Sequence, residues 1–125
     1  MPRRIFHVPG VPDPVSPIPH AVVAGGTCHI SGQLSTDGNG YVPGTAAEEA
    51  DRAMGHILAI AQAAGFTRDE FVYIDLAFSD LDDLPAVNES YARHFPDAPA
   101  RTIYEAQRLP YGAKIKVQAV AQKDG

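Results

Sequence analysis

The sequence contains one cysteine and no tryptophan, and its ten lysines and arginines are outnumbered by fifteen aspartates and glutamates. A single cysteine, Cys28, excludes an intrachain disulfide and a cysteine-rich metal site. The formal net charge is 10 − 15 = −5, and no cluster of four or more lysines and arginines occurs. Nucleic-acid binding draws most of its affinity from clustered cations that neutralise phosphates. The composition therefore argues against a nucleic-acid partner.

Long apolar runs are also absent. The longest are only a few residues, far short of the roughly 20 that span a bilayer. Residues 1–9 contain two arginines but no apolar core of a secretory signal. We therefore expect no membrane contact and a cytoplasmic location. At 125 residues, 45% hydrophobic and 20% charged, the chain has the size and composition of a single globular domain spanning 1–125.

The common catalytic motifs are missing too. The glycine loops that bind phosphates, the zinc motif HExxH and the nucleophile motif GxSxG do not occur. The five histidines do not pair at ligand spacing, so we expect no metal site, and His56 is expected to be an ordinary helix-face residue. For Cys28, a thiol buried in a strand is favoured over a nucleophile, because no paired base is evident.

Prolines and glycines divide the first third of the chain. Six of the eleven prolines lie within residues 2–19. Because proline fixes φ and donates no ladder hydrogen bond, we expect a short strand over Arg3–Val8 and then an irregular connector. The connector either lies along the surface or walls a pocket. Gly25-Gly26 predicts a hairpin turn between strands at 20–24 and 27–31, and a second turn is expected at 37–40.

Two helices are predicted. Thr45 and Glu48 match a capping box, and apolar residues recur every three or four positions after them, which predicts a helix over 46–64. The second helix begins at the acidic pair 82–83 and is ended by Pro96. Its apolar stripe consists of Leu84, Val87, Tyr91 and Phe95.

Alternating apolar residues predict a strand over 71–78, with Val72, Ile74, Leu76 and Phe78 on one face. Strands at 101–108 and 114–121 are expected to form a hairpin around a turn at 109–112. Two helices among about six strands indicate an α+β fold, in which helices cover one face of a mixed sheet.

The uncovered face of this sheet is expected to be of mixed polarity. We assign to it Val22, Tyr73, Ile103 and Val120. A sheet face that is neither fully apolar nor as polar as a solvent-exposed face is typical of a subunit interface, so we expect a closed oligomer.

Elimination leaves Pro99-Ala100-Arg101-Thr102, at the start of a predicted strand, as the segment best suited to chemistry. Arginine presents a rigid fork of N–H donors that matches a planar carboxylate, and a proline-fixed turn would hold it in place. An ordinary surface arginine is the alternative. Asn88 on the second helix is likewise either solvated or bonded to a loop.

Several short motifs occur in an order that is found in a known family. They are Ser31-Gly32-Gln33, Ala63-Ala64-Gly65-Phe66, Val87-Asn88-Glu89-Ser90-Tyr91, Phe95-Pro96, Pro99-Ala100-Arg101 and Leu109-Pro110. From about residue 16 to 121 the chain resembles the Rid (reactive intermediate deaminase) family, some members of which carry the older labels of translation inhibitor or endoribonuclease.

The resemblance implies a chorismate-mutase-like fold that assembles as a homotrimer, with the sheets in an inner barrel and small carboxylates bound in three intersubunit clefts. Family deaminases hydrolyse enamine or imine acids, such as 2-aminoacrylate, to 2-oxo acids and ammonia, and they use no cofactor. In them the arginine of the PAR motif grips the substrate carboxylate, and Arg101 matches that position. The other candidate substrate-binding residues are Asn88, Ile18, His20, Ser31 and Tyr104.

Two matched positions depart from the deaminase pattern. The family's Gly-Pro-Tyr segment is Ser16-Pro17-Ile18 here, and the glutamate that orients the attacking water is replaced by Lys116. His20 or Tyr104 is the candidate to replace the lost polar groups. Lys116 either binds a second carboxylate, as in an aminomuconate-type substrate, or pairs with Glu105 on a neighbouring strand.

These departures leave two functions open. The first is an enamine or imine deaminase, and the alternative is a non-catalytic trimer that binds a small carboxylate. Ribonuclease action, which the older family labels suggest, is disfavoured by the acidic charge balance.

Overall fold

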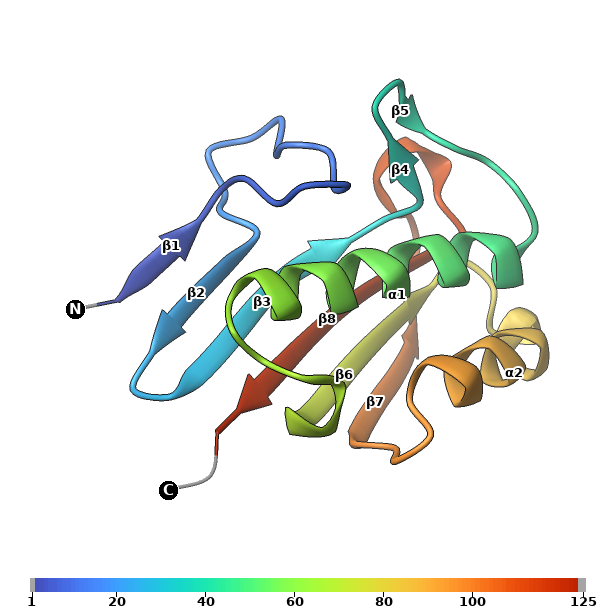
Figure 1. Ribbon diagram of the computed structural model, residues 1–125. Helices are drawn as coiled ribbons and strands as arrows, with labels where there is room; N and C mark the ends of the chain where they lie inside the picture. The colour runs from blue at the N-terminus through green and yellow to red at the C-terminus, as the bar shows by residue number, and fades with distance from the viewer. Residues whose placement is uncertain (1, 124–125) are drawn as a thin grey trace.

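A mixed sheet of six strands is the framework of the computed structural model, which describes residues 2–123 (Figure 1). The strands lie in the order β1-β2-β3-β8-β6-β7. Their bounds are Arg3–Ile5 (β1), Ala21–Ala24 (β2), Thr27–Gln33 (β3), Phe71–Phe78 (β6), Ala100–Glu105 (β7) and Ile115–Gln122 (β8). A separate hairpin consists of β4 (Thr36–Asp37) and β5 (Gly40–Tyr41), and single 3-10 turns occur at η1 (Arg68–Glu70), η2 (Leu81–Asp83) and η3 (Pro110–Gly112).

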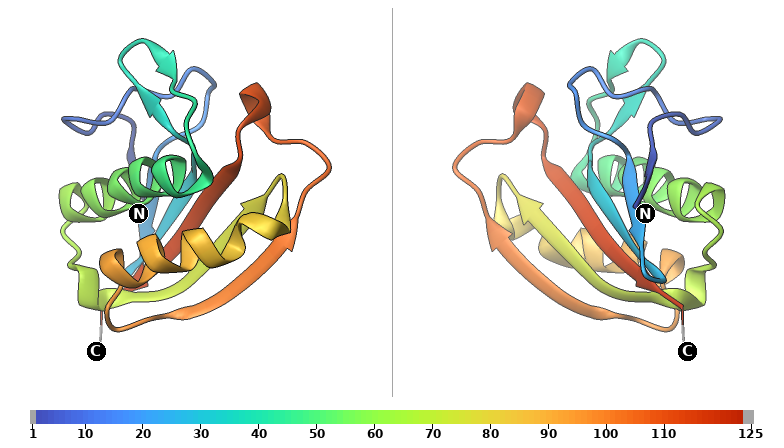
Figure 2. Two further views of the ribbon diagram at one scale, coloured as in Figure 1. Left: turned by 90° about the vertical axis from the view of Figure 1, so that its right-hand side faces the viewer. Right: turned by 90° about the vertical axis from the view of Figure 1, so that its left-hand side faces the viewer.

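Both helices, α1 (Ala46–Ala63) and α2 (Leu84–His94), cover the same face of the sheet (Figure 2). The capping box of α1 is confirmed: the Thr45 hydroxyl accepts the Glu48 amide at 3.1 Å, and the Glu48 carboxylate accepts the Thr45 amide at 2.8 Å. No helix of residues 2–123 covers the opposite face. The predicted α+β layering is therefore confirmed, and one face of the sheet is left open.

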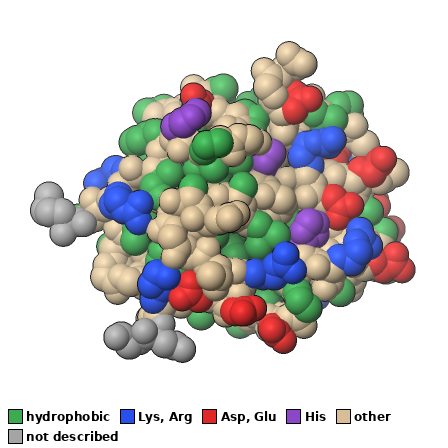
Figure 3. Space-filling view, viewed as in Figure 1, with side chains coloured by type: hydrophobic (Ala, Val, Ile, Leu, Met, Phe, Trp, Pro, Cys, Tyr) green, Lys and Arg blue, Asp and Glu red, His purple; other side chains and the backbone are tan. Residues whose placement is uncertain are grey.

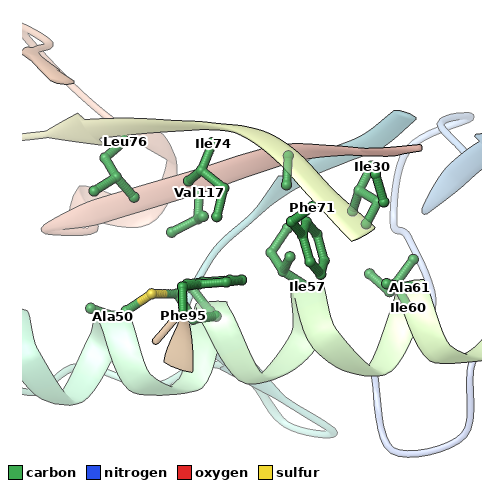
Figure 4. Close-up of a cluster of buried hydrophobic side chains, with 14 of the residues drawn as sticks. Ile30, Ala50, Ile57, Ile60, Ala61, Phe71, Ile74, Leu76, Phe95 and Val117 are labelled. Atoms are coloured by element: carbon green, nitrogen blue, oxygen red, sulfur yellow. The ribbon is translucent and has the colours of Figure 1, made fainter. Parts of the chain in front are cut away.

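The core lies between the sheet and the two helices. Ile74 and Leu76 of β6 and Val117 of β8 point toward α1, from which Ala50 and Ile57 point back (Figure 4). All five are fully buried. Because several of the inward-facing residues of α1 are alanines, the helix backbone lies close to the sheet.

The predicted turns are confirmed. Gly25 and Gly26 join β2 to β3 with φ of +57° and +83°, the left-handed values that a two-residue hairpin of this type requires. The second turn joins β4 to β5.

The first strand is shorter than predicted. It ends at Ile5, and Val8 instead forms an isolated bridge with Val11, whose amide donates to the Val8 carbonyl at 3.0 Å. Gly10 between them has φ +85°, so the chain reverses where the sequence predicted that a strand would continue.

The predicted hairpin of the last two strands is wrong. β7 runs parallel to β6 and ends at Glu105, whereas β8 lies between β3 and β6 and is antiparallel to both. The reason is the helical connection: α2 carries the chain from the end of β6 back to its beginning, so β7 starts beside the start of β6.

The predicted faces of β6 are wrong at its first two residues. Phe71 is buried, and it packs edge to face against Phe95 at 5.3 Å between ring centroids, whereas Val72 is 46% exposed. The register shows why: Phe71 pairs with Ala121 and Tyr73 with Val120, so β6 has one more residue than β8 at this point. This bulge reverses the alternation that the sequence predicted.

Candidate functional site

Arg101 lies on β7, next to α2. Its Nη1 donates to Asn88 Oδ1 at 2.9 Å, and its Cζ lies 4.7 Å from the centroid of the Tyr91 ring. Arg101 pairs with the buried Ile74 of β6, so its side chain points to the helix-covered face. The structure therefore brings together Arg101 and Asn88, which the sequence identified separately. It adds Tyr91, which was assigned only to the core.

The groups that hold Arg101 are uncharged. No carboxylate of the described chain forms an ion pair with it, and the bond to Asn88 occupies one of its five N–H donors. Burial raises the pKa of Tyr91, and the positive charge of Arg101 partly opposes that rise. The half-buried guanidinium thus has a fixed position and free donors, which suits it to bind an anion.

Three other candidate substrate-binding residues lie toward the opposite edge of the sheet from β7. The His20 ring is buried, with Nε2 2.9 Å from the Pro12 carbonyl oxygen, and the Ser31 hydroxyl donates to the Pro19 carbonyl at 2.7 Å. Ile18, in the same connector, is 51% exposed. β3 is three strands away from β7, about 14 Å at the usual strand spacing. Within one chain this group does not meet Arg101.

Two buried histidines, His20 and His56, make the stability of the folded protein pH-dependent. Burial lowers the pKa of His20 and also that of His56, which lies under β4 with Nε2 2.8 Å from the Thr36 carbonyl oxygen. The two histidines are therefore protonated at a higher pH in the unfolded chain than in the folded chain. The stability that the folded chain gains from keeping them neutral is complete above about pH 6.5 and is lost as the pH falls below that value.

We therefore expect the urea midpoint to fall between pH 7.5 and pH 5.5 at fixed protein concentration. The double variant His20→Gln/His56→Gln should lose most of this dependence, whereas His29→Gln, at an exposed histidine, should keep it. A midpoint that is constant over this range in the unsubstituted protein would contradict the prediction.

Lys116 lies on the open face of the sheet. Ala77 of β6 pairs with Lys116 on one side and Tyr104 on the other, so the three side chains share a face. Because Ala77 and Ile74 are three positions apart on one strand, Lys116 and Arg101 lie on opposite faces. The proposed ion pair with Glu105 does not form: β6 lies between the two strands, and Glu105 Oε1 accepts the Leu81 amide at 3.0 Å.

The open face is of mixed polarity, as predicted for Val22, Tyr73 and Val120. A hollow of about 230 Å³ on this face is lined by these three residues and by His29, Ser31, Gln118 and others. Beside Gln118, Asp75 has one carboxylate oxygen that is buried and has no hydrogen-bond partner in the described chain. Ile103 was assigned to this face wrongly: it packs on the main core, because it is two residues from Arg101 and points the same way.

Comparison with known proteins identifies the family. A family model described as Endoribonuclease L-PSP matches residues 10–123. The chain belongs to this family. A 2-iminobutanoate/2-iminopropanoate deaminase from Capra hircus is 35% identical over 122 residues, which cover 95% of this chain and 89% of the relative. The resemblance to the Rid family, which includes such proteins, is thereby confirmed.

Solved structures share the fold of this L-PSP/Rid family chain. The Thermotoga maritima protein TM0215 superposes with a TM-score of 0.92 at 32% identity, covering 98% of this chain and 99% of that one. The YjgF gene product from E. coli superposes with a TM-score of 0.91 at 28% identity, covering 98% and 100%. The predicted Rid-type fold is confirmed by these matches.

The remaining features of the L-PSP/Rid chain concern potential metal ligands, membrane-spanning helices, the cysteine and the surface charge. No group of three or more potential metal ligands occurs within residues 2–123, and none of the helices there is long and apolar enough to cross a membrane. Cys28 is fully buried, as favoured from the sequence, and burial raises the pKa of its thiol. On the helix-covered face, acidic and basic side chains are interspersed and form no continuous basic stripe (Figure 3).

Proposed function

We propose that the protein hydrolyses small 2-imino acids, or their enamine tautomers, to 2-oxo acids and ammonia. The observation that carries this proposal is the guanidinium of Arg101, which Asn88 and Tyr91 hold in place while most of its donors stay free. The deaminase name of the relatives, at 35% and 34% identity in goat and human, supports the substrate class. The cytoplasm is the proposed location.

The reaction needs little beyond the placement of two reactants. The oxygen of water adds to the carbon of the C=N bond and one of its protons goes to the nitrogen; the resulting carbinolamine passes its hydroxyl proton to the amino group and loses ammonia as the C–N bond breaks and the C=O bond forms. The imine carbon is already electrophilic. A carboxylate held on the fork of Arg101 fixes this carbon relative to the cleft, so positioning supplies much of the rate enhancement.

We place the site between two subunits of a homotrimer. Arg101 and Asn88 lie at the β7 end of the sheet, and His20 and Ser31 lie at the other end, so a site that uses both groups draws on two copies. Apolar side chains stand exposed near the second group, with Val15 90% and Ile18 51% exposed. A contiguous exposed apolar patch is typical of an interface, and these two side chains lie three residues apart in one connector.

Lys116 extends the proposal to the choice of substrate. It lies on the open face with no ion pair to any carboxylate of residues 2–123. Because Lys116 and Arg101 of one chain lie on opposite faces of the sheet, a trimer would have to turn the open face of one copy toward the Arg101 of a neighbouring copy, and the ammonium would then bind the second carboxylate of the substrate. Dicarboxylic imino acids of the aminomuconate type are therefore included in the proposed substrate class. Tyr104 lies on the same open face as Lys116 and is the polar group that would adjoin the second carboxylate.

Turnover separates the two functions that the sequence left open. 2-Iminobutanoate generated in situ by an amino-acid oxidase should disappear faster in the presence of the protein, with equal amounts of 2-oxobutanoate and ammonia released. Binding of 2-oxo acids without any rate enhancement would support the non-catalytic alternative. Neither binding nor turnover, with mono- and dicarboxylic substrates, would reject both.

A further inference from the structure

Both contacts that fix Arg101 come from α2. Asn88 and Tyr91 are three residues apart, so they lie on one face of the helix and move with it. The helix has only 11 residues and is attached to β6 and β7 by connections that are not part of the sheet. The position of the guanidinium therefore depends on how α2 is fixed.

Beside the apolar packing of its inward face, α2 is held to α1 by side-chain hydrogen bonds to a single carboxylate. Asp51 accepts a hydrogen bond from the Ser90 hydroxyl, lies 3.2 Å from His94 Nε2, and accepts from Arg93 Nη2 at 3.3 Å. The three donors belong to α2, and Ser90 lies between the two residues that hold Arg101. Among residues 2–123, no other side chain of α1 makes a hydrogen bond to α2.

We propose that Asp51 is a positioning residue: by fixing α2 through Ser90, it holds Asn88 and Tyr91 where they orient Arg101 for the substrate carboxylate. This inference rests on the proposed function of Arg101.

The buried part of this network carries the effect. Ser90 is fully buried and Asp51 is 44% exposed, so their hydrogen bond is better shielded from solvent than the ion pair with Arg93, which is 62% exposed and adds little. Burial raises the pKa of Asp51, but hydrogen bonds from Ser90 and His94 and the charge of Arg93 outweigh it, and the pKa lies below its usual value. The group is therefore ionised at neutral pH.

The test is a double-mutant cycle between Asp51 and Arg101. Asp51→Ala should lower kcat/KM by about 10-fold in the unsubstituted protein, because small displacements of a positioning group are costly. It should cause no further loss in the Arg101→Ala background. Ser90→Ala should behave like Asp51→Ala, and Asp97→Ala, at an exposed aspartate after α2, is the control. All assays are made well below the unfolding midpoint of each variant.

A ligand-free measurement keeps this inference separate from the proposed function. In ¹⁵N spectra of the assembled protein, rotation of the Arg101 guanidinium should be faster in Asp51→Ala and in the milder Asp51→Asn. Faster rotation with a normal kcat/KM rejects the link to substrate. Unchanged rotation, or an equal loss of activity in both backgrounds, rejects the inference itself. If Arg101→Ala is fully active, the proposed function fails, and the rotation still decides whether Asp51 orients Arg101.

Discussion

Replacing Arg101 with alanine should lower kcat/KM for a 2-imino acid by about 100-fold or more, while the protein stays folded. When a carboxylate is bound by two charge-assisted hydrogen bonds, truncating the partner side chain costs roughly 2–5 kcal/mol of binding free energy. Arg101 is half-buried on the edge strand, and the one side-chain hydrogen bond that it makes within residues 2–123 is to exposed Asn88, so stability should change little. Steady-state kinetics with in situ generated 2-iminobutanoate, next to thermal unfolding, measures both quantities.

Two further arginine variants sharpen this prediction. Arg101→Lys keeps the charge but replaces the planar fork with a point charge, so it should recover only part of the loss. Arg68→Ala removes an exposed arginine on η1 whose side chain forms no ion pair within residues 2–123, and it should leave kcat/KM unchanged. Full activity of Arg101→Ala would remove the guanidinium from the mechanism.

Loss of the buried carboxylate of Glu49 should destabilise the fold strongly. Its carboxylate is completely buried in α1, where it accepts the Tyr41 hydroxyl at 2.6 Å and the Lys114 amide at 3.0 Å. It thereby joins the β4-β5 hairpin and the start of β8 to the helix. Burial and the Glu49 carboxylate raise the pKa of Tyr41 to about 12, so the phenol keeps the proton that it donates.

We expect Glu49→Ala to lower the free energy of unfolding by about 3 kcal/mol, because two partly buried donors, the Tyr41 hydroxyl and the Lys114 amide, lose their fully buried acceptor. Glu49→Gln keeps one acceptor oxygen and should lose roughly half as much. Urea titration at pH 7.5 measures the effect. Glu89→Ala, at an exposed glutamate on α2, should stay within about 0.5 kcal/mol of the unsubstituted protein. A similarly small change for Glu49→Ala would show that this network contributes little.

Elements fixed by local chemistry were predictable from the sequence. The capping box of Thr45 and Glu48 needs only residues three positions apart, and the glycine pair 25–26 needs only its own backbone freedom. Both were located correctly. The apolar stripe of α2 was also correct, because helical spacing alone determines which residues face the core.

Pairing between distant segments was not predictable in the same way. The hairpin expected for the last two strands failed because the sequence does not reveal that β8 enters the sheet between β3 and β6. The bulge at Phe71 depends on the register against β8, so alternation alone placed Val72 wrongly on the face of Ile74 and Leu76. Ile103 was assigned to the wrong face for a related reason: the face of an edge strand is set by its partner.

The site shows the same division. Arg101 and Asn88 could be identified as candidates, but their contact depends on α2 lying against β7. Glu49 was overlooked although a signal existed: it lies four residues before Ala53 and seven before His56, both buried, so a charge stands on the inward face of the helix. Asp51 carries no such signal, because its importance depends on donors from the other helix.

Calorimetric titration with 2-oxobutanoate, the expected reaction product, tests most directly whether the guanidinium of Arg101 holds a carboxylate. We predict saturable binding to the unsubstituted protein, with about one site per chain, and affinity at least 10-fold weaker in Arg101→Ala. Equal affinity in the two proteins would contradict the central claim that this arginine is the carboxylate-binding group.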